Sequence, residues 1–335
     1  MNNLVIITGP TAVGKTEISI ELAKAINGEI ISADSIQVYK YMDIGSAKIK
    51  KEEMQGIKHY LIDEFEPDDE FNVNVFQKLT KKYINEIYEK GKTPIIVGGT
   101  GFYIQSVLYD IDFDETEDNH EYRKTLEQIY KDKGAQYLYN MLKEVDEESA
   151  KAIHYNNVKR VIRALEYNHQ TGKKISDHNK EQREHASPYN FKYFVLNDKR
   201  ELLYSRINKR VDLMIKEGLV DEVKSLLDKG YDRNLVSMQG IGYKEIIEYL
   251  DGKISLEEAV ELIKKNTRHF AKRQLTWFRR EKTITHSFFS STERVEAFLF
   301  VDTDSPSVRT HGKDYSISFR FRKRAGAGVF CRRSR

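Results

Sequence analysis

A glycine-rich segment near the start of the chain constrains its fold more than any other feature. The segment reads Gly9-Pro10-Thr11-Ala12-Val13-Gly14-Lys15-Thr16 and fits the pattern G-x-x-x-x-G-K-S/T. The β-branched run Leu4-Val5-Ile6-Ile7 before it is typical of a buried parallel strand. After it, apolar residues recur at helical intervals as far as Ile26, and Gly28 is expected to end that helix. Because unpaired backbone N–H groups converge between such a strand and helix, the segment predicts a site for an anion with several oxygens.

Two side chains complete the predicted anion site. Lys15 adds a positive charge, and the hydroxyl of Thr16 is in the position that holds Mg²⁺ in loops of this pattern. The loop therefore predicts a bound phosphate or diphosphate with Mg²⁺, but it does not identify the molecule that carries the phosphate.

The composition is that of a globular protein. The chain has 335 residues, of which 39% are hydrophobic and 32% charged, so it is long enough for more than one compact unit. No apolar run approaches the ~20 residues that a bilayer span needs, and Met1 leads directly into the first expected strand, so we expect no signal peptide. The sequence contains one cysteine, Cys331, which excludes a disulfide within the chain and favours the cytoplasm.

The charges are distributed unevenly. From Lys264 to Arg335 there are 18 Lys and Arg against 6 Asp and Glu, whereas the remainder has 37 against 46. A basic C-terminal part on an acidic body indicates a polyanionic partner larger than a nucleotide. A basic helix that faces solvent without a partner is the alternative.

Candidate reacting groups follow two further strands. The strand expected at 29–32 leads to Asp34, and the strand expected at 93–97 leads to Gly98-Gly99-Thr100-Gly101. Ligands of open α/β sheets bind at the carboxyl ends of strands. The Asp34 carboxylate is therefore a candidate Mg²⁺ ligand or general base, with the capping of a following helix as the alternative. The glycines are expected to leave the Thr100 hydroxyl exposed.

The alternation of strands and helices predicts an α/β fold with a parallel sheet that is covered on both faces. Further strands at 59–62 and 192–196 and a helix at 74–89 belong to this core. From about 114 to 184 the patterns are helical only, which predicts an all-helical insertion. We place the core at 1–112 and 190–288, the insertion at 113–189, and an atypical basic tail, expected to be mobile, at 289–335.

Basic residues recur on the expected helices. In the insertion, Lys159 and Arg163 lie four apart and share a face, with Arg160 beside them and Arg123 near the insertion's start. Charges that only face solvent are the alternative. On a later helix Arg206 and Arg210 have the same spacing, and an arginine there could bind a diphosphate bidentately.

The last long helix is expected to start with a capping box at Ser255 and Glu258. Gln274 interrupts its apolar stripe. A separate basic stripe consists of Lys265, Arg268, Lys272 and Arg279.

Four segments taken together resemble one enzyme family: the glycine-rich loop, Asp34-Ser35-Ile36-Gln37-Val38-Tyr39, Gly98-Gly99-Thr100-Gly101, and His269-Phe270-Ala271-Lys272-Arg273-Gln274-Leu275-Thr276-Trp277. The combination is similar to the tRNA dimethylallyltransferases, or tRNA isopentenyltransferases, from about residue 3 to about residue 283. The resemblance implies a P-loop NTPase/kinase-like core with a helical insertion that binds the anticodon stem-loop. It also implies transfer of a dimethylallyl group from dimethylallyl diphosphate to N6 of the adenosine that follows the anticodon.

The resemblance further implies roles for individual residues. The glycine-rich loop would hold the diphosphate with Mg²⁺ on Thr16, and Asp34 would accept the N6 proton. Thr100 and Arg210 would stabilise the departing diphosphate or bind the adenosine. Contact with tRNA is implied for Asp34, Ser35, Ile36, Gln37, Thr100, Arg123, Lys159, Arg160, Val161, Ile162, Arg163, Lys272 and Arg273. The tail after about residue 285 does not resemble the family and receives no role.

Other functions are compatible with parts of this pattern. A P-loop kinase for a small metabolite would hold ATP in the loop and use Asp34 as base, because the fold alone does not decide the function. A prenyltransferase could act on free adenine nucleotides, and a non-catalytic RNA-binding protein could use the loop as a switch. The basic helices favour RNA, and Asp34 with Thr100 favours chemistry. We expect a cytoplasmic monomer that binds tRNA and no membrane.

Overall fold

The computed structural model describes residues 3–113 and 120–281, and the strand residues 286–289, 296–302, 309–310, 313–314 and 316–322. The chain divides into two compact units. One contains Met1–Val107 and Tyr189–Arg335, and the other contains Leu108–Pro188.

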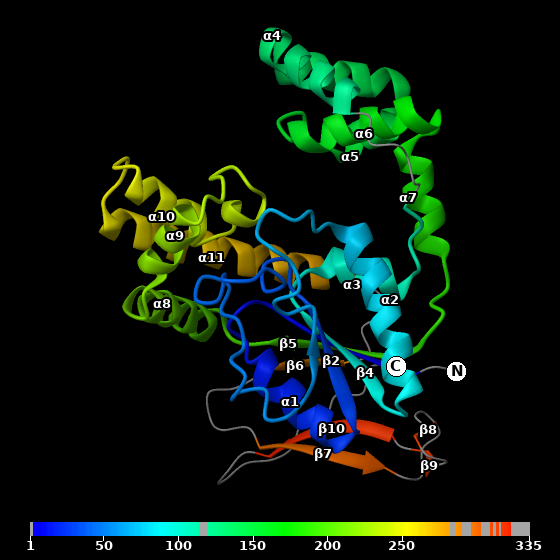
Figure 1. The fold of residues 1–335 in the computed structure, drawn as a ribbon. Coiled ribbons are helices and arrows are strands. Elements are labelled where there is room, and N and C mark those ends of the chain that lie inside the picture. The colour runs from blue at the N-terminus through cyan, green and yellow to red at the C-terminus, as the bar shows by residue number, and fades with distance from the viewer. Residues whose placement is uncertain are drawn as a thin grey trace. The chain divides into compact units, whose positions relative to one another are not determined.

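The first unit is built on a six-stranded parallel sheet with the order β3-β2-β4-β1-β5-β6 (Figure 1). The strands are β1 (Asn3–Thr8), β2 (Gly28–Ala33), β3 (His59–Tyr60), β4 (Thr93–Gly98), β5 (Asn190–Asn197) and β6 (His286–Phe289). The first five coincide with the strands that the sequence predicts. The α/β fold class with a parallel sheet is confirmed.

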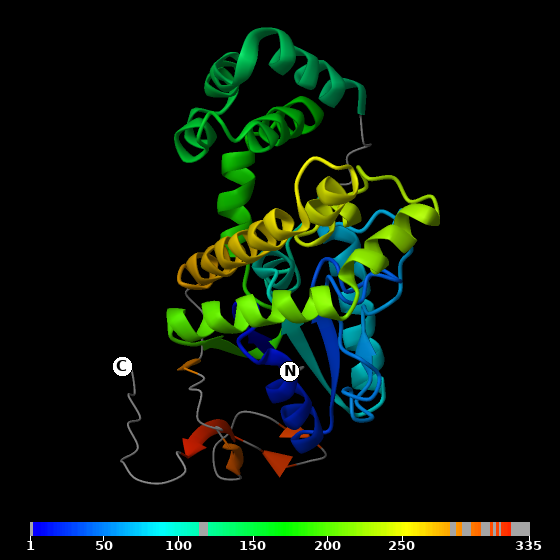
Figure 2. The same ribbon diagram turned by 90° about the vertical axis from the view of Figure 1, so that its left-hand side faces the viewer.

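Helices cover both faces of this sheet. They are α1 (Lys15–Ala25), α2 (Val73–Glu89), α3 (Gly101–Leu108), α8 (Arg200–Lys216), α9 (Leu219–Asp228), α10 (Tyr243–Leu250) and α11 (Leu256–Phe278), with a 3₁₀ turn at Ser237–Gln239. Val5 and Ile7 of β1 share one hydrophobic core with residues of α1, α8 and α11, and Figure 2 shows α8 and α11 side by side. Leu4 and Ile6, which alternate with them, are also buried. A strand that is apolar on both sides belongs in a sheet covered on both sides.

The register of the sheet brings three strand ends to one edge. Gly98 at the end of β4 pairs with Thr8 of β1 on one side and with Ala33 of β2 on the other. Because the strands are parallel, the segments that follow β1, β2 and β4 all leave from this carboxyl edge.

One predicted helix end is wrong, and another helix boundary is confirmed. Helix α1 ends at Ala25, and Asn27 makes the turn with φ 52°. Gly28 is already the first residue of β2, where a Cβ atom would lie 2.7 Å from the Ile95 side chain. Asparagine adopts this left-handed conformation more readily than most residues, so the turn needs no glycine. The capping box at Ser255 and Glu258 is present at the start of α11.

In its described residues the second unit has helices joined by turns and loops, and no strand. It contains α4 (His120–Val145), α5 (Glu147–Ala152), α6 (Val158–Thr171) and α7 (Ile175–Glu184). Gly134, with φ 80°, interrupts the helical backbone of α4. A core of its own, which includes Leu138 and Leu142 of α4 and Leu165 of α6, holds the unit together.

Beyond β6 the described residues form short strands. β7 (Glu296–Asp302) pairs with β10 (Ser316–Arg322), and β8 (Arg309–Thr310) pairs with β9 (Lys313–Asp314), both antiparallel. The sequence predicts no regular element in this part, because its periodicity is weak. The mobility of the tail stays a prediction, and residues 323–335 lie outside the described part of the chain.

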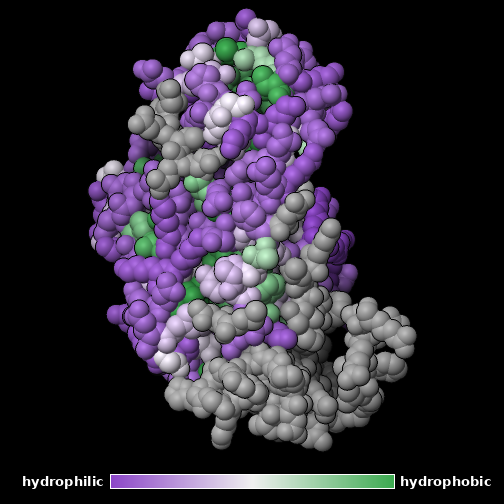
Figure 3. All heavy atoms as spheres, turned by 90° about the vertical axis from the view of Figure 1, so that its right-hand side faces the viewer, coloured by the Kyte–Doolittle hydropathy of each residue, from purple (hydrophilic) through white to green (hydrophobic). Residues whose placement is uncertain are grey.

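The described surface is mainly hydrophilic on the face in Figure 3, where hydrophobic residues form small scattered groups. Among the helices within the described ranges, none is both long and apolar enough to cross a membrane.

Candidate active site

The glycine-rich loop joins β1 to α1 in the conformation that its glycines permit. Gly9 has φ 147°, and a Cβ atom there would lie 2.4 Å from the backbone oxygen of Leu196 in β5. Gly14, with φ 95°, precedes α1 and has no side chain to cap its first N–H groups. The N-terminus of α1 therefore presents uncapped donors and the positive end of the helix dipole to the carboxyl edge of the sheet.

Lys15 lies within this loop with its ammonium turned toward the backbone. Its Nζ donates to the carbonyl oxygens of Gly9 at 3.0 Å and Pro10 at 2.9 Å. Desolvation lowers the pKa of Lys15 from 10.5 to about 8; the Asp34 carboxylate acts in the opposite direction, and the Arg210 guanidinium adds to the lowering. Charged groups from α1, the end of β2 and α8 are thus close enough to influence one another.

Arg206 and Arg210 have different surroundings, although they share a face of α8. Arg206 forms an ion pair of 2.9 Å with the buried carboxylate of Asp198. Arg210 forms no ion pair within residues 3–113 and 120–281. Its side chain is reachable from solvent, yet desolvation by the surrounding protein lowers its pKa below the usual value. A desolvated cation without a counter-charge favours the binding of an anion.

Asp34 is the first residue after β2, and no helix follows it. Its Oδ1 accepts hydrogen bonds from the backbone N–H of Ile36 at 2.9 Å and of Gln37 at 3.3 Å. The alternative that Asp34 caps a following helix is therefore wrong. Its side chain accepts from backbone N–H groups as a helix cap does, but here these groups belong to a turn. Oδ2 forms no hydrogen bond with the described residues, so one oxygen fixes the orientation and the other is available to a ligand.

The turn after β4 lies against the end of β2. A Cβ atom on Gly98 would lie 2.2 Å from the backbone oxygen of Ala33. The backbone N–H of Thr100 donates to that same oxygen at 3.3 Å. Since Ala33 directly precedes Asp34, the two residues that the sequence singles out at strand ends, Thr100 and Asp34, are brought together.

Gln274 connects the glycine-rich loop with the turn after β4. Its Oε1 accepts from the backbone N–H of Thr11 at 2.9 Å, and its Nε2 donates to the backbone oxygen of Gly99 at 3.0 Å. The side chain is buried, and a Cβ atom on Gly99 would lie 2.1 Å from Nε2. An amide side chain can satisfy a backbone donor and a backbone acceptor at the same time. The sole sequence signal for this bridge is the polar interruption of the apolar stripe.

Other residues of α11 divide between packing and exposure. A Cβ atom on Gly101 would lie 2.2 Å from Cδ1 of the Trp277 indole, so the indole packs closely against this glycine. Phe278 is buried. Lys272 and Arg273 are exposed, and the Arg273 guanidinium lies 5.7 Å from the centre of the Phe270 ring.

The basic residues of the second unit fall into two groups. Lys159, Arg160 and Arg163 on α6 are exposed. Arg123 of α4 forms a bidentate ion pair with the buried Glu166 of α6, at 2.7 and 2.6 Å. The side chains of Val161 and Ile162, which lie between the exposed cations in the sequence, belong to the core of this unit. A ligand on α6 would therefore meet the cations and not these two side chains.

The residues of the loop are compatible with Mg²⁺. No cluster of three or more His, Cys, Asp or Glu that could hold a metal occurs in the described residues. Mg²⁺ beside a phosphate needs few protein ligands, because phosphate oxygens and water supply most of its coordination. The Thr16 side chain is exposed at the start of α1, and its hydroxyl forms no hydrogen bond in the described part of the chain.

Comparison with known proteins gives consistent results. Residues 37–281 match the family described as IPP transferase. The tRNA dimethylallyltransferase of Lachnoclostridium phytofermentans is 63% identical over 284 residues, which cover 85% of this chain and 91% of that protein. The crystal structure of the tRNA isopentenylpyrophosphate transferase from Bacillus halodurans is similar with a TM-score of 0.65 and 47% identity, covering 86% of this chain and 90% of that one. A eukaryotic dimethylallyltransferase acting on tRNA gives a TM-score of 0.70 at 32% identity, over 83% and 70% of the two chains.

Proposed function

Because the chain belongs to the IPP transferase family, we propose that it transfers a dimethylallyl group from dimethylallyl diphosphate to N6 of the adenosine on the 3′ side of the tRNA anticodon. The observation that carries the proposal is the convergence of three charged groups at one sheet edge. Lys15 is close enough to both Asp34 and Arg210 for each to affect its pKa. Two cations for a leaving diphosphate and one carboxylate for a proton are what this reaction requires.

The diphosphate binds to the glycine-rich loop. The N–H groups at the start of α1 donate to its oxygens, and Lys15 and Arg210 supply positive charge. Thr16 would hold Mg²⁺ with the diphosphate, and the ion would neutralise part of the charge on the leaving group. Gln274 keeps the loop and the turn carrying Thr100 in a fixed relation.

The acceptor approaches from the side of Asp34. The adenosine N6 attacks the allylic carbon next to the diphosphate oxygen, a C–N bond forms, and the C–O bond breaks with its electron pair going to the diphosphate. The proton that N6 loses goes to the free Oδ2 of Asp34. Thr100, beside Asp34, orients the adenosine or the departing diphosphate through its hydroxyl.

The helical unit and α11 supply the contacts to the rest of the tRNA. Lys159, Arg160 and Arg163 are exposed on one helix, as residues that meet phosphates must be. Arg123, whose guanidinium binds Glu166, lies on α4 of the same unit, and we assign it a contact with the tRNA because the family resemblance implies one. Lys272 and Arg273 provide a second basic surface. These contacts position the tRNA and do not read its sequence.

One experiment separates the proposed function from its rivals. The protein is incubated with dimethylallyl diphosphate labelled in the allylic group, Mg²⁺ and either unmodified tRNA or AMP, and the labelled products are identified by mass spectrometry. Binding of ATP is measured separately by calorimetry. We expect the label on N6 of one adenosine in tRNA, and no label on free AMP. Label on free AMP alone would favour the prenyltransferase for nucleotides. No transfer at all, with tight binding of ATP, would favour the kinase.

A further inference from the structure

We propose that Glu222 is a positioning residue for the acceptor side of the reaction. The inference is that its carboxylate fixes the segment from Asp34 to Lys48, which follows β2 and contains the candidate base. It rests on the proposed function and deepens it, because it assigns a role in substrate alignment to a residue outside the candidate site.

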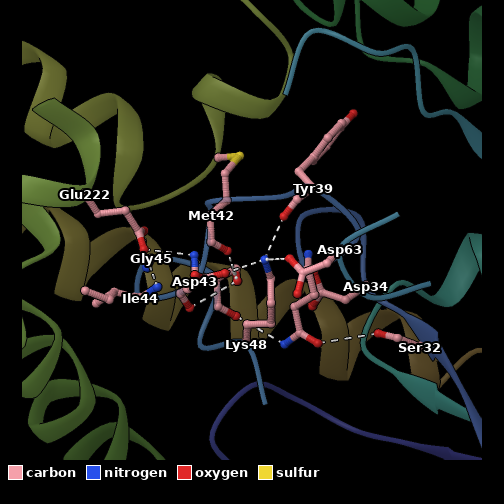
Figure 4. A network of polar contacts seen from close by, with 12 residues as sticks. Ser32, Asp34, Tyr39, Met42, Asp43, Ile44, Gly45, Lys48, Asp63 and Glu222 are labelled. Atoms are coloured by element: carbon pink, nitrogen blue, oxygen red, sulfur yellow. Dashed lines mark hydrogen bonds and ion pairs between the residues drawn. The ribbon is translucent and has the colours of Figure 1, made fainter. Parts of the chain in front are cut away.

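Glu222 lies on α9 and binds a tight turn of this segment. Its Oε2 accepts from the backbone N–H of Asp43 at 2.9 Å and of Ile44 at 2.7 Å, and its Oε1 accepts from that of Gly45 at 3.0 Å. Figure 4 shows the carboxylate against the backbone of Ile44 and Gly45. Three consecutive N–H groups that point to one place form an anion site, and here the protein's own carboxylate fills it.

A second contact fixes the carboxylate itself. The hydroxyl of Tyr243 on α10 donates to Oε1 of Glu222 at 2.8 Å. The Tyr243 ring is buried against the same turn, since a Cβ atom on Gly45 would lie 2.5 Å from it. Glycine is needed at this position for close approach, and helices α9 and α10 together hold the turn.

The turn is connected to Asp34 through Gln37. The Nε2 of Gln37 donates to the backbone oxygens of Ser46 at 3.2 Å and Ala47 at 3.3 Å, just after the residues that bind Glu222. The backbone N–H of Gln37 donates to Oδ1 of Asp34. Glu222 is therefore linked to the oxygen that orients the candidate base by hydrogen bonds that are joined through the backbone of residues 43–47 and through Gln37.

Lys48 stabilises the same segment from its other side. Its buried ammonium donates to the backbone oxygen of Tyr39 at 2.7 Å and to the carboxylates of Asp43 and Asp63. The turn is thus held by Glu222 on one side and by Lys48 on the other. The glycine-rich loop forms none of these hydrogen bonds, so Glu222 should affect the acceptor side more than the binding of the diphosphate.

The variant Glu222→Gln tests the proposal at constant side-chain size. An amide offers one acceptor oxygen and places an NH₂ group where the other oxygen was, opposite backbone N–H groups that cannot accept from it. Asp221→Asn is the matched control, because it removes the same charge from an exposed neighbour on the same helix. Calorimetry with dimethylallyl diphosphate and Mg²⁺, and steady-state kinetics with tRNA, are measured for both variants and the wild type.

For Glu222→Gln we expect a loss of about 10- to 100-fold in kcat/KM for tRNA, in the range that small misplacements of reacting groups cause. The Kd for dimethylallyl diphosphate should stay within about 2-fold of the wild type, since the loop is not involved. Asp221→Asn should match the wild type in both. Hydrogen exchange should show faster exchange at the amides of Asp43, Ile44 and Gly45 in Glu222→Gln only.

Two outcomes would overturn the inference. One is tRNA kinetics for Glu222→Gln equal to those of Asp221→Asn; the other is an equal loss of affinity for both substrates, which would indicate a general structural defect. If Glu222→Gln does not fold, Tyr243→Phe provides the test, because it removes one hydrogen bond and keeps the ring against Gly45. Tyr243→Phe should then show a smaller loss of kcat/KM for tRNA, again without a loss of affinity for dimethylallyl diphosphate. A wild-type protein that does not prenylate tRNA would instead reject the proposed function.

Discussion

Lys15 should take up a proton when the diphosphate binds. Burial lowers its pKa from 10.5 to about 8 in the free protein, so at pH 8 about half of the Lys15 side chains are neutral. A diphosphate beside the amine favours the charged form and returns the pKa toward its ordinary value. Binding should therefore take up about half a proton per site at pH 8, about a tenth at pH 7 and close to one at pH 9.

The same shift has a consequence for folding. Because the pKa of Lys15 is lower in the folded than in the unfolded chain, the folded state binds fewer protons between pH 8 and pH 10.5. The free energy of unfolding should therefore rise with pH across this window. Below pH 8 the half-buried Lys15 ammonium lowers the free energy of unfolding by about 1–3 kcal/mol, once solvent screening is allowed for. Diphosphate binding should recover part of that cost.

Calorimetry measures the proton uptake directly. Binding of dimethylallyl diphosphate with Mg²⁺ is measured at pH 7, 8 and 9 in buffers of different ionisation enthalpy, and the slope of the binding enthalpy gives the number of protons. Lys15→Met removes the amine and should lose this proton uptake at pH 8. Any proton exchange that remains in this variant comes from other groups, such as the ligand, and is subtracted. Lys24→Met, at an exposed lysine of the same helix, should keep it. Equal uptake in wild type and Lys15→Met would refute the reasoning.

Further predictions concern the base, the bridge between the loops and the RNA surface. Asp34→Asn should bind both substrates but lose ~10²–10⁴ in single-turnover rate, as loss of a general base does; a nearly normal rate would exclude Asp34 from this role. Gln274→Met should weaken dimethylallyl diphosphate binding about 10-fold, because it removes the bridge between Thr11 and Gly99 and leaves a half-buried N–H and a buried carbonyl without this partner, while KM for tRNA stays constant in steady-state assays. Lys159→Gln with Arg163→Gln should reduce the slope of log K for tRNA against log salt by about 2, and an unchanged slope would contradict phosphate contacts there.

Features that depend on neighbours in the sequence were predictable. The glycine-rich loop, the strand before it and the helix after it occupy adjacent residues, and the apolar run at residues 4–7 is typical of a buried strand. Asp34 and Thr100 could be singled out because each follows a strand. The helix end predicted at Gly28 is wrong because a turn with φ above zero can use Asn27 as well as glycine.

Contacts between distant residues were not predictable from one sequence. Gln274 accepts from Thr11, which lies 263 positions earlier in the chain. Its place in an apolar stripe marks it as unusual, but nothing in the sequence indicates its partner. The ion pair of Arg123 with Glu166 spans 43 positions and joins two helices of the insertion. Periodicity shows which face of a helix is apolar, but it does not show which partner a polar residue on that face will meet.

The two halves of the proposed reaction therefore differ in how the chain builds them. The donor half is a local structure, since the loop from Gly9 to Thr16 forms an anion site by its own backbone. The acceptor half depends on Glu222, which binds residues 177 to 179 positions away. Because a local anion site tolerates changes elsewhere better than a segment held from a distance, substitutions outside the loop should impair tRNA use before they impair diphosphate binding. Gln274 and Arg210 are the exceptions, because both are distant in sequence and yet act on the loop or its ligand.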